Sequence, residues 1–266
     1  MTIYEIIILA IIQGITEFLP ISSSAHLLLP AELLGWRSQG LAFDVAVHVG
    51  SLLAVLIYLR REISDMTIDF FRFGFTKQQT ENSRLAWWVI VGTLPIILIG
   101  FLLKDWIELN ARTALVMAVT TIGFGLLLWY ADATAKLTNK MTQMRIGQAV
   151  IIGIAQILAL IPGTSRSGIT MTASLMLGFD RESAARFSFL LSIPAILGAG
   201  LLSTLDLLQE ADAVDWTALL YGAAFSFVSA YLCIYLFLNW ISRIGMLPFV
   251  IYRLILGAIL LWFVFA

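Results

Sequence analysis

Charged side chains are scarce in this sequence. Of its 266 residues, 12% are Asp, Glu, Lys or Arg, whereas an ordinary soluble domain has about 25%. Hydrophobic residues make up 60% of the chain, and the mean hydropathy is +0.94. The shortage of charge excludes an ordinary soluble fold and indicates an all-α protein that crosses a membrane several times.

An excess of basic residues and a second cysteine are also missing. The net charge of -1 provides no basic surface, so we expect no nucleic-acid partner. Cys233 is the only cysteine, which excludes an intrachain disulfide and a Cys-x-x-Cys site. The opening segment MTIYEIIILA contains Glu5 and lacks the basic region of a signal peptide. We therefore expect this segment to belong to the folded protein.

Long apolar runs, by contrast, are abundant. A helix needs about 20 apolar residues to cross the hydrocarbon of a bilayer. Six stretches meet this requirement: 41–59, 85–103, 113–131, 187–205, 216–238 and 248–266. Four others are too short or are interrupted: 3–19, 27–34, 148–161 and 169–178.

Each pair of short segments flanks a break rich in Pro and Ser. This pattern predicts two re-entrant helical hairpins, because irregular backbone at membrane depth survives only inside protein or beside a wet cavity. The alternative is that each pair forms one kinked span.

The charges of the connections predict the orientation of the chain. Segments 60–84 and 132–147 contain several Lys and Arg residues, and segment 206–215 contains none. The positive-inside rule places the first two in the cytoplasm and the third outside. Counting crossings then places the N-terminus and the first hairpin on the outer side, and the second hairpin enters from the cytoplasmic side.

Hairpins that enter from opposite faces suggest an internal repeat. PISSS at 20–24 resembles PGTSRS at 162–167, Leu34-Gly35 resembles Leu177-Gly178, and three long spans follow each copy. We interpret the chain as one integral membrane domain built as an inverted-topology repeat, with halves at about 1–131 and 148–266. In such repeats the broken helices meet near the midplane and form a site there.

The second break, LIPGTSRSGIT, favours an anion. Hydroxyl groups of Ser165, Ser167 and Thr170 surround Arg166, and the N-terminus of a half-helix follows directly. Hydroxyl donors, a guanidinium group and a helix N-terminus together suit a phosphate. The alternative is that Arg166 snorkels or pairs structurally, although an arginine at membrane depth costs at least about 2.5 kcal/mol.

The first break, QGITEFLPISSSAH, favours proton and metal chemistry. Glu17 is a candidate general base or a ligand for a divalent cation. His26 is a candidate for proton transfer, and Ser22 or Ser23 is a candidate nucleophile. The alternative for the serines is to cap the second half-helix, which is the role that we expect for Ser24.

Three polar residues in the long spans remain ambiguous. Asp44 and His48 lie near the start of a span, where they either line a cavity or meet the interface. Arg253 in PFVIYR lies five residues into the last span, where snorkelling is also cheap.

QGITEFLPISSSAH, PGTSRSGIT and PFVIYR resemble the three signature stretches of the undecaprenyl-pyrophosphate phosphatase family, also called the bacitracin-resistance family. The resemblance extends along the whole chain. It implies an enzyme of the bacterial inner membrane that hydrolyses undecaprenyl diphosphate to undecaprenyl phosphate. That reaction recycles the lipid carrier for peptidoglycan synthesis and cell-wall biogenesis, and confers resistance to bacitracin.

The resemblance also implies the site. It predicts the polyprenyl diphosphate lipid as substrate and a divalent cation, Mg²⁺ or Ca²⁺, as cofactor. By its motifs, Glu17, Ser23, His26, Ser165, Arg166, Thr170 and Arg253 match active-site positions, and the site is expected to open to the periplasm. The expected partners are the lipid substrate and the surrounding membrane lipid, with a homodimer as the arrangement to test.

One residue departs from the family pattern. Many members have glutamate where this chain has Gln13, and glutamine is neither a base nor a charged ligand. Glu17 would then hold the metal alone. A rival function is a transporter or flippase for a phosphorylated lipid, because paired broken helices in inverted repeats are also a transporter architecture.

Overall fold

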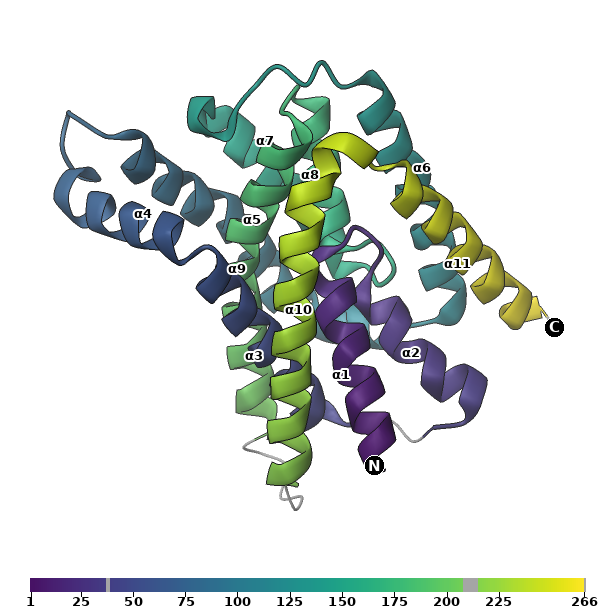
Figure 1. The fold of residues 1–266 in the computed structure, drawn as a ribbon. Coiled ribbons are helices and arrows are strands. Elements are labelled where there is room, and N and C mark those ends of the chain that lie inside the picture. Colours follow the sequence, from purple (N-terminus) through teal and green to yellow (C-terminus); the bar gives the residue numbers. More distant parts are fainter. Residues whose placement is uncertain (37–38, 208–214, 266) are drawn as a thin grey trace.

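The computed structural model describes residues 1–36, 39–207 and 215–265, and its regular elements are helices throughout these ranges (Figure 1). Six of the helices are long and apolar enough to cross a membrane. They are α3 (Leu41–Tyr58), α5 (Glu81–Asn110), α6 (Ala114–Thr134), α9 (Arg181–Leu207), α10 (Trp216–Ile244) and α11 (Leu247–Phe265). The prediction of an all-α, polytopic membrane protein is confirmed.

The four short segments form two pairs of half-helices. The first pair is α1 (Ile3–Phe18) and α2 (Ser23–Leu34). The second pair is α7 (Ile146–Gln156), extended by the 3-10 turn η2 (Ile157–Leu160), and α8 (Arg166–Met176). Figure 1 shows the two pairs entering the bundle from opposite ends, so that their breaks meet in its interior.

The second half-helices begin earlier than predicted. We expected them to start near residues 27 and 169, but α2 begins at Ser23 and α8 at Arg166. The N-cap residues are Ser22 and Ser165; the Ser165 hydroxyl accepts from the backbone N–H of Gly168 at 3.1 Å, whereas the Ser22 side chain makes no such bond. The expectation that Ser24 caps α2 was therefore wrong. As a result, Ser23 and Arg166 are the first residues of their helices.

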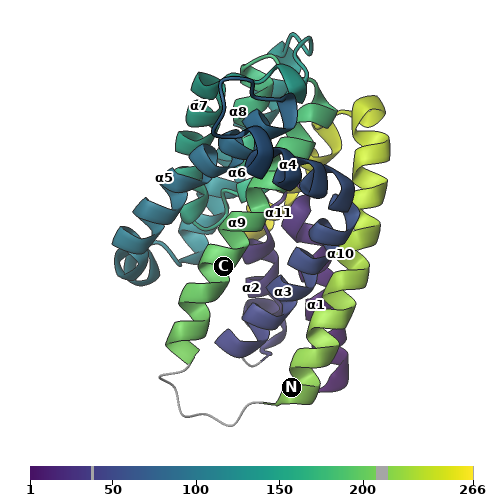
Figure 2. The same ribbon diagram turned by 90° about the vertical axis from the view of Figure 1, so that its left-hand side faces the viewer.

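Close contacts between small residues hold the long helices around the hairpins. Figure 2 shows α1, α3 and α10 packed side by side. At Gly50 of α3 the backbone of α10 is so near that an added Cβ would lie 2.2 Å from the carbonyl oxygen of Ala223. One turn away, the Ser226 hydroxyl donates to the carbonyl of Val47 at 2.6 Å. On the other side of the molecule, α6 packs against α11.

The basic connections gather at one end of the bundle, which we call the basic end. Segment 60–84, predicted as a loop, contains the helix α4 (Arg60–Phe73), which projects from the bundle (Figure 1). The connection between the predicted spans 85–103 and 113–131 is also shorter than expected, because α5 continues to Asn110. The N-terminus and the start of α10 lie at the opposite end, which we call the N-terminal end. Most of segment 206–215 lies outside the described residues.

Ion pairs join the helices at the basic end. The carboxylate of Asp132 on α6 accepts from Arg181 of α9 at 2.6 Å and from the backbone N–H of Met246 at 3.1 Å. Arg186 of α9 pairs with Glu62 of α4. These bonds join α4, α6, α9 and the connection between α10 and α11 at this end of the bundle.

Candidate active site

Both breaks place a serine in the same unusual backbone conformation. Ser22 has a φ of 76° and Ser165 a φ of 70°. A non-glycine residue at positive φ costs about 1–3 kcal/mol, and such strain concentrates at functional sites. Each serine is the N-cap of its half-helix, so the unpaired N–H groups of α2 and of α8 both face the interior of the bundle.

Arg253 holds the two breaks together. Its side chain is fully buried on α11, and glycines at positions 125 and 168 make room for it. The guanidinium group donates at 2.9–3.4 Å to backbone carbonyls of both breaks and of α6: those of Pro20, Gly163, Thr164, Thr120 and Thr121. This arginine, predicted as a phosphate ligand, does not line the cavity described below. The structure therefore assigns its donors to backbone.

Glu17 connects the first break to the second. Its Oε1 accepts from Nη2 of Arg166 at 3.2 Å, across the interface between the hairpins. Its Oε2 accepts from the Ser23 hydroxyl at 2.9 Å and from the Gln13 amide at 3.0 Å. Nε2 of His48 lies 3.8 Å from the same oxygen. The carboxylate is thus surrounded by donors on both sides.

Arg166 keeps free donors beside Glu17. One terminal nitrogen bonds Glu17, and the other donates to the carbonyl of Ser188 at 3.2 Å. A guanidinium group has five N–H donors, so these two bonds leave others for a ligand. Arg166 also lines the cavity, so its remaining donors lie beside the carboxylate that accepts from Ser23.

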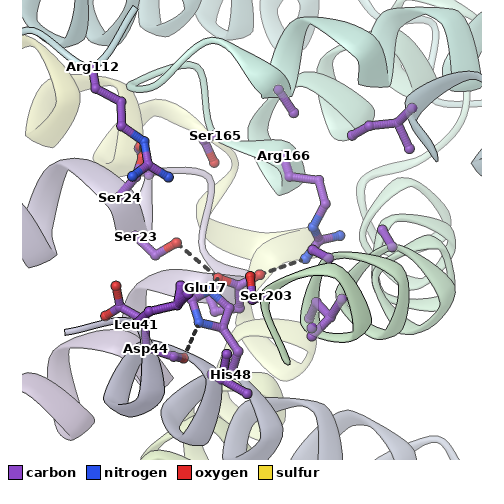
Figure 3. Close-up of a pocket in the computed structure, with 18 residues that line it drawn as sticks. Glu17, Ser23, Ser24, Leu41, Asp44, His48, Arg112, Ser165, Arg166 and Ser203 are labelled. Carbon is purple, nitrogen blue, oxygen red and sulfur yellow. Dashed lines mark hydrogen bonds and ion pairs between the residues drawn. The ribbon is translucent and has the colours of Figure 1, made fainter. Parts of the chain in front are cut away.

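These groups face one cavity of about 350 Å³ (Figure 3). Its polar wall contains Glu17, Ser23, Ser165 and Arg166, together with the ends of α2 and α8. Part of the remaining wall is apolar or small: Ile96 of α5 and Ala195, Ile196, Ala199 and Gly200 of α9. An anionic group joined to a hydrocarbon chain matches this two-sided lining.

The structure does not bring His26 into the cavity. Its Nδ1 bonds the carbonyl of Ser22 at 2.7 Å, and its Nε2 bonds the hydroxyl of Tyr252 at 2.6 Å, against which the imidazole stacks. Because a carbonyl only accepts, Nδ1 carries a proton in this arrangement. The ring thereby fixes the strained residue before Ser23. A catalytic role for His26 stays a prediction from the resemblance.

The other predicted phosphate-binding residues divide into two groups. Ser165 lines the cavity. Ser167 is buried, and its hydroxyl donates to the carbonyl of Leu19 at 2.8 Å. Thr170 is also buried and donates to the Ser188 hydroxyl at 2.8 Å. Ser167 and Thr170 thus bond neighbouring protein groups outside the cavity and support the second break.

Three cavity residues carried only weak sequence signals. Asp44 and His48 lie one helical turn apart on α3, and Nδ1 of His48 bonds the carbonyl of Asp44 at 2.7 Å. The i, i+4 spacing was visible in the sequence, but the approach of His48 to Glu17 of α1 was not. Arg112 lies in the connection between α5 and α6 and resembled an ordinary loop charge.

The side chains around Glu17 could supply part of the ligand set of a cation. Among the described residues there is no group of three or more His, Cys, Asp or Glu side chains that could hold a metal alone. Mg²⁺, however, is commonly held by one or two carboxylates together with substrate phosphates. Glu17 supplies a carboxylate, and Oε1 of the neighbouring Gln13 is buried without a hydrogen-bond partner. This donor set fits a cation that arrives with a phosphate ligand.

Comparisons with known proteins agree with this chemistry. Residues 6–259 match the family model described as bacitracin resistance protein BacA. The chain is 76% identical over 266 residues to the undecaprenyl-diphosphatase of Alteromonas mediterranea, covering the full length of both chains. It is 60% identical over 263 residues to undecaprenyl-diphosphatase 1 of Pseudoalteromonas translucida, covering 99% of each.

The contacts of Arg253 generate a prediction about stability. Lysine has three donors and lacks the fork, so Arg253→Lys should lose bonds to the breaks, where the carbonyls of Pro20 and Thr164 accept from Arg253 alone among the described residues. Each buried carbonyl left unpaired costs about 1–3 kcal/mol. We expect a clear fall in the apparent melting temperature of the purified protein in detergent. Arg243→Lys, at an exposed position of α10, is the matched control and should melt like the wild type. Equal melting of both variants would show that Arg253 does not hold the breaks together.

Proposed function

The chain belongs to the family of the bacitracin resistance protein BacA, and we propose that it is an undecaprenyl-diphosphatase. It hydrolyses undecaprenyl diphosphate to undecaprenyl phosphate and inorganic phosphate. The product is the lipid carrier for peptidoglycan synthesis, and the family takes its name from resistance to bacitracin.

The observation that carries this proposal is the meeting of a nucleophile, a carboxylate and a guanidinium group at two helix N-termini. Ser23 and Arg166 both contact Glu17, although they come from different hairpins. Phosphoryl transfer requires mainly positioning and stabilisation of negative charge. The N–H groups of α2 and α8 and the spare donors of Arg166 supply both for the terminal phosphate.

The contacts of Ser23 also support the chemical step. The Ser23 hydroxyl donates to Oε2 of Glu17, so this carboxylate is placed to take its proton. The serine oxygen then attacks the terminal phosphorus and forms a phosphoserine bond that water later hydrolyses, or it orients a water that attacks directly. In either case the bond to the bridging oxygen breaks, the lipid monophosphate leaves, and water supplies the remaining oxygen of inorganic phosphate.

We propose Glu17 and the diphosphate oxygens as the ligands of a divalent cation, Mg²⁺ or Ca²⁺. The cation would neutralise charge on the phosphates. Arg166 already contacts Glu17, so a second cation is favourable there only when the diphosphate adds its own negative charge.

We further propose that the cavity opens to the periplasmic side of the inner membrane. The support is the basic end of the bundle, which the positive-inside rule places in the cytoplasm. Arg112, after the last residue of α5, and Asp44, in the first turn of α3, line the cavity on the side away from the basic end. Homodimer formation stays a prediction.

The enzymatic proposal and the phosphate role of Arg166 are tested together. Purified protein in detergent, where transport is impossible, should release phosphate from undecaprenyl diphosphate. Arg166→Lys keeps the charge but loses the fork, and should lower turnover by roughly a hundred- to a thousandfold. Arg72→Lys, exposed on α4, is the control. No release by the wild type would favour the flippase, and a rate within a few-fold for Arg166→Lys would return this residue to a structural role.

The metal proposal is tested by chelation and by two neighbouring variants. Removing divalent cations should abolish phosphate release, and Mg²⁺ or Ca²⁺ should restore it. Gln13→Glu places a second carboxylate beside Glu17, so half-maximal activity should need less cation. Glu17→Gln should be inactive at every cation concentration, whereas the exposed Asp65→Asn should behave as wild type. Substantial activity of Glu17→Gln would refute its assignment as ligand or base.

The orientation is tested with single cysteines. Cys233 is buried, so the wild-type chain should react poorly with a membrane-impermeant thiol reagent in intact cells. Thr217→Cys, at the exposed start of α10, should react, and Gln78→Cys, in the exposed turn after α4, should react only after lysis. The reverse pattern would place the cavity on the cytoplasmic side.

A further inference from the structure

The cavity contains two arginines from separate parts of the chain. Arg166 begins α8 within the second break, and Arg112 belongs to the connection between α5 and α6. In the view of Figure 3 the two side chains approach the cavity from opposite sides, with Ser23 and Glu17 between them. The proposed terminal-phosphate site accounts for Arg166, but it does not account for Arg112.

Contacts of α6 place Arg112 between the second break and the N-terminal end of the bundle. The hydroxyl of Thr120 donates to the carbonyl of Pro162 at 2.6 Å, which fixes this level of α6 at the second break. Thr113 caps α6 seven residues earlier, a rise of about 10 Å along a helix. Arg112 precedes this cap, so it lies nearer to the N-terminal end of the bundle than the Glu17–Arg166 pair does.

The apolar wall begins at the break and follows α9 toward the same end. It includes Ile196, Ala199 and Gly200, and an added Cβ at Gly200 would meet no atom within 4 Å. A lipid diphosphate has its reacting phosphate at one end and its hydrocarbon attached to the other phosphate. With the reacting phosphate beside Ser23, the second phosphate must lie between that point and the apolar wall.

We propose that Arg112 binds the phosphate that remains on the lipid, while Arg166 binds the phosphate that is removed. This inference rests on the proposed function and adds a second phosphate subsite to it. Asp44 also lines this end of the cavity. Its negative charge weakens the attraction of Arg112 for an anion that cannot also bind at Arg166. A free phosphate can bind only one of the two arginines, whereas a lipid diphosphate can bind both.

This division of roles has a kinetic consequence. The phosphate at Arg112 is present in the substrate, the transition state and the lipid product alike. Its contact is therefore uniform binding, and losing it raises KM more than it lowers kcat. The lipid monophosphate should lose affinity by a similar factor. Inorganic phosphate, which Arg166 holds, should not.

The test uses Arg112→Gln with three probes: undecaprenyl diphosphate as substrate, and undecaprenyl phosphate and inorganic phosphate as inhibitors. A hydrogen bond to a charged group corresponds to about ten- to a hundredfold in affinity, so KM and the inhibition constant of the lipid monophosphate should both rise by that factor. The inhibition constant of inorganic phosphate should stay unchanged. Arg112→Lys should recover part of the loss, and Arg72→Gln is the control for removal of one positive charge.

Other outcomes overturn the inference. A weaker inhibition by inorganic phosphate, with a fall in kcat, would place Arg112 on the transferred phosphate. Unchanged constants for all three probes would make Arg112 a surface charge. Direct binding of undecaprenyl phosphate to Arg112→Gln needs no turnover, so a normal affinity there would refute the subsite even if the protein proved not to be a phosphatase.

Discussion

A buried guanidinium group that bonds backbone carbonyls is the interaction on which the rest of this structure depends. Breaks in helices expose carbonyl groups at a depth where water is not available, and each unpaired group is costly. Arg253 supplies several donors from one rigid fork and reaches both breaks and α6 at once. The two hairpins can therefore end in the interior and present their helix N-termini to one cavity.

Between the two breaks held by Arg253, the carboxylate of Glu17 and the guanidinium group of Arg166 lie in contact. Glu17 and Arg166 are both nearly buried, and a buried ion pair contributes little net stability because each charge loses its hydration. What the pair does provide is a fixed geometry. Ser23 is held on the far side of the same carboxylate, so positions contributed by two distant segments of the chain are set by a single side chain.

Much of this arrangement could be predicted from sequence. The spans follow from apolar length, and the breaks follow from Pro, Ser and Gly at membrane depth. The separate roles of Arg166 and Arg253 could not be predicted, because the sequence places both arginines at membrane depth but does not show what either side chain contacts. Only packing decides that one faces a cavity and the other faces carbonyls. His48 was also ambiguous, because its neighbour Glu17 comes from a different helix.

The position of Arg253 along the chain has a consequence for biogenesis. The ribosome makes both hairpins well before α11, so until the last helix is inserted the breaks lack the donors that Arg253 provides. The final helix is inserted last, and its Arg253 then bonds carbonyls that were synthesised long before it. Nascent chains arrested ahead of α11 would be expected to present open hairpins to the membrane's quality-control proteases, whereas completed chains would resist them.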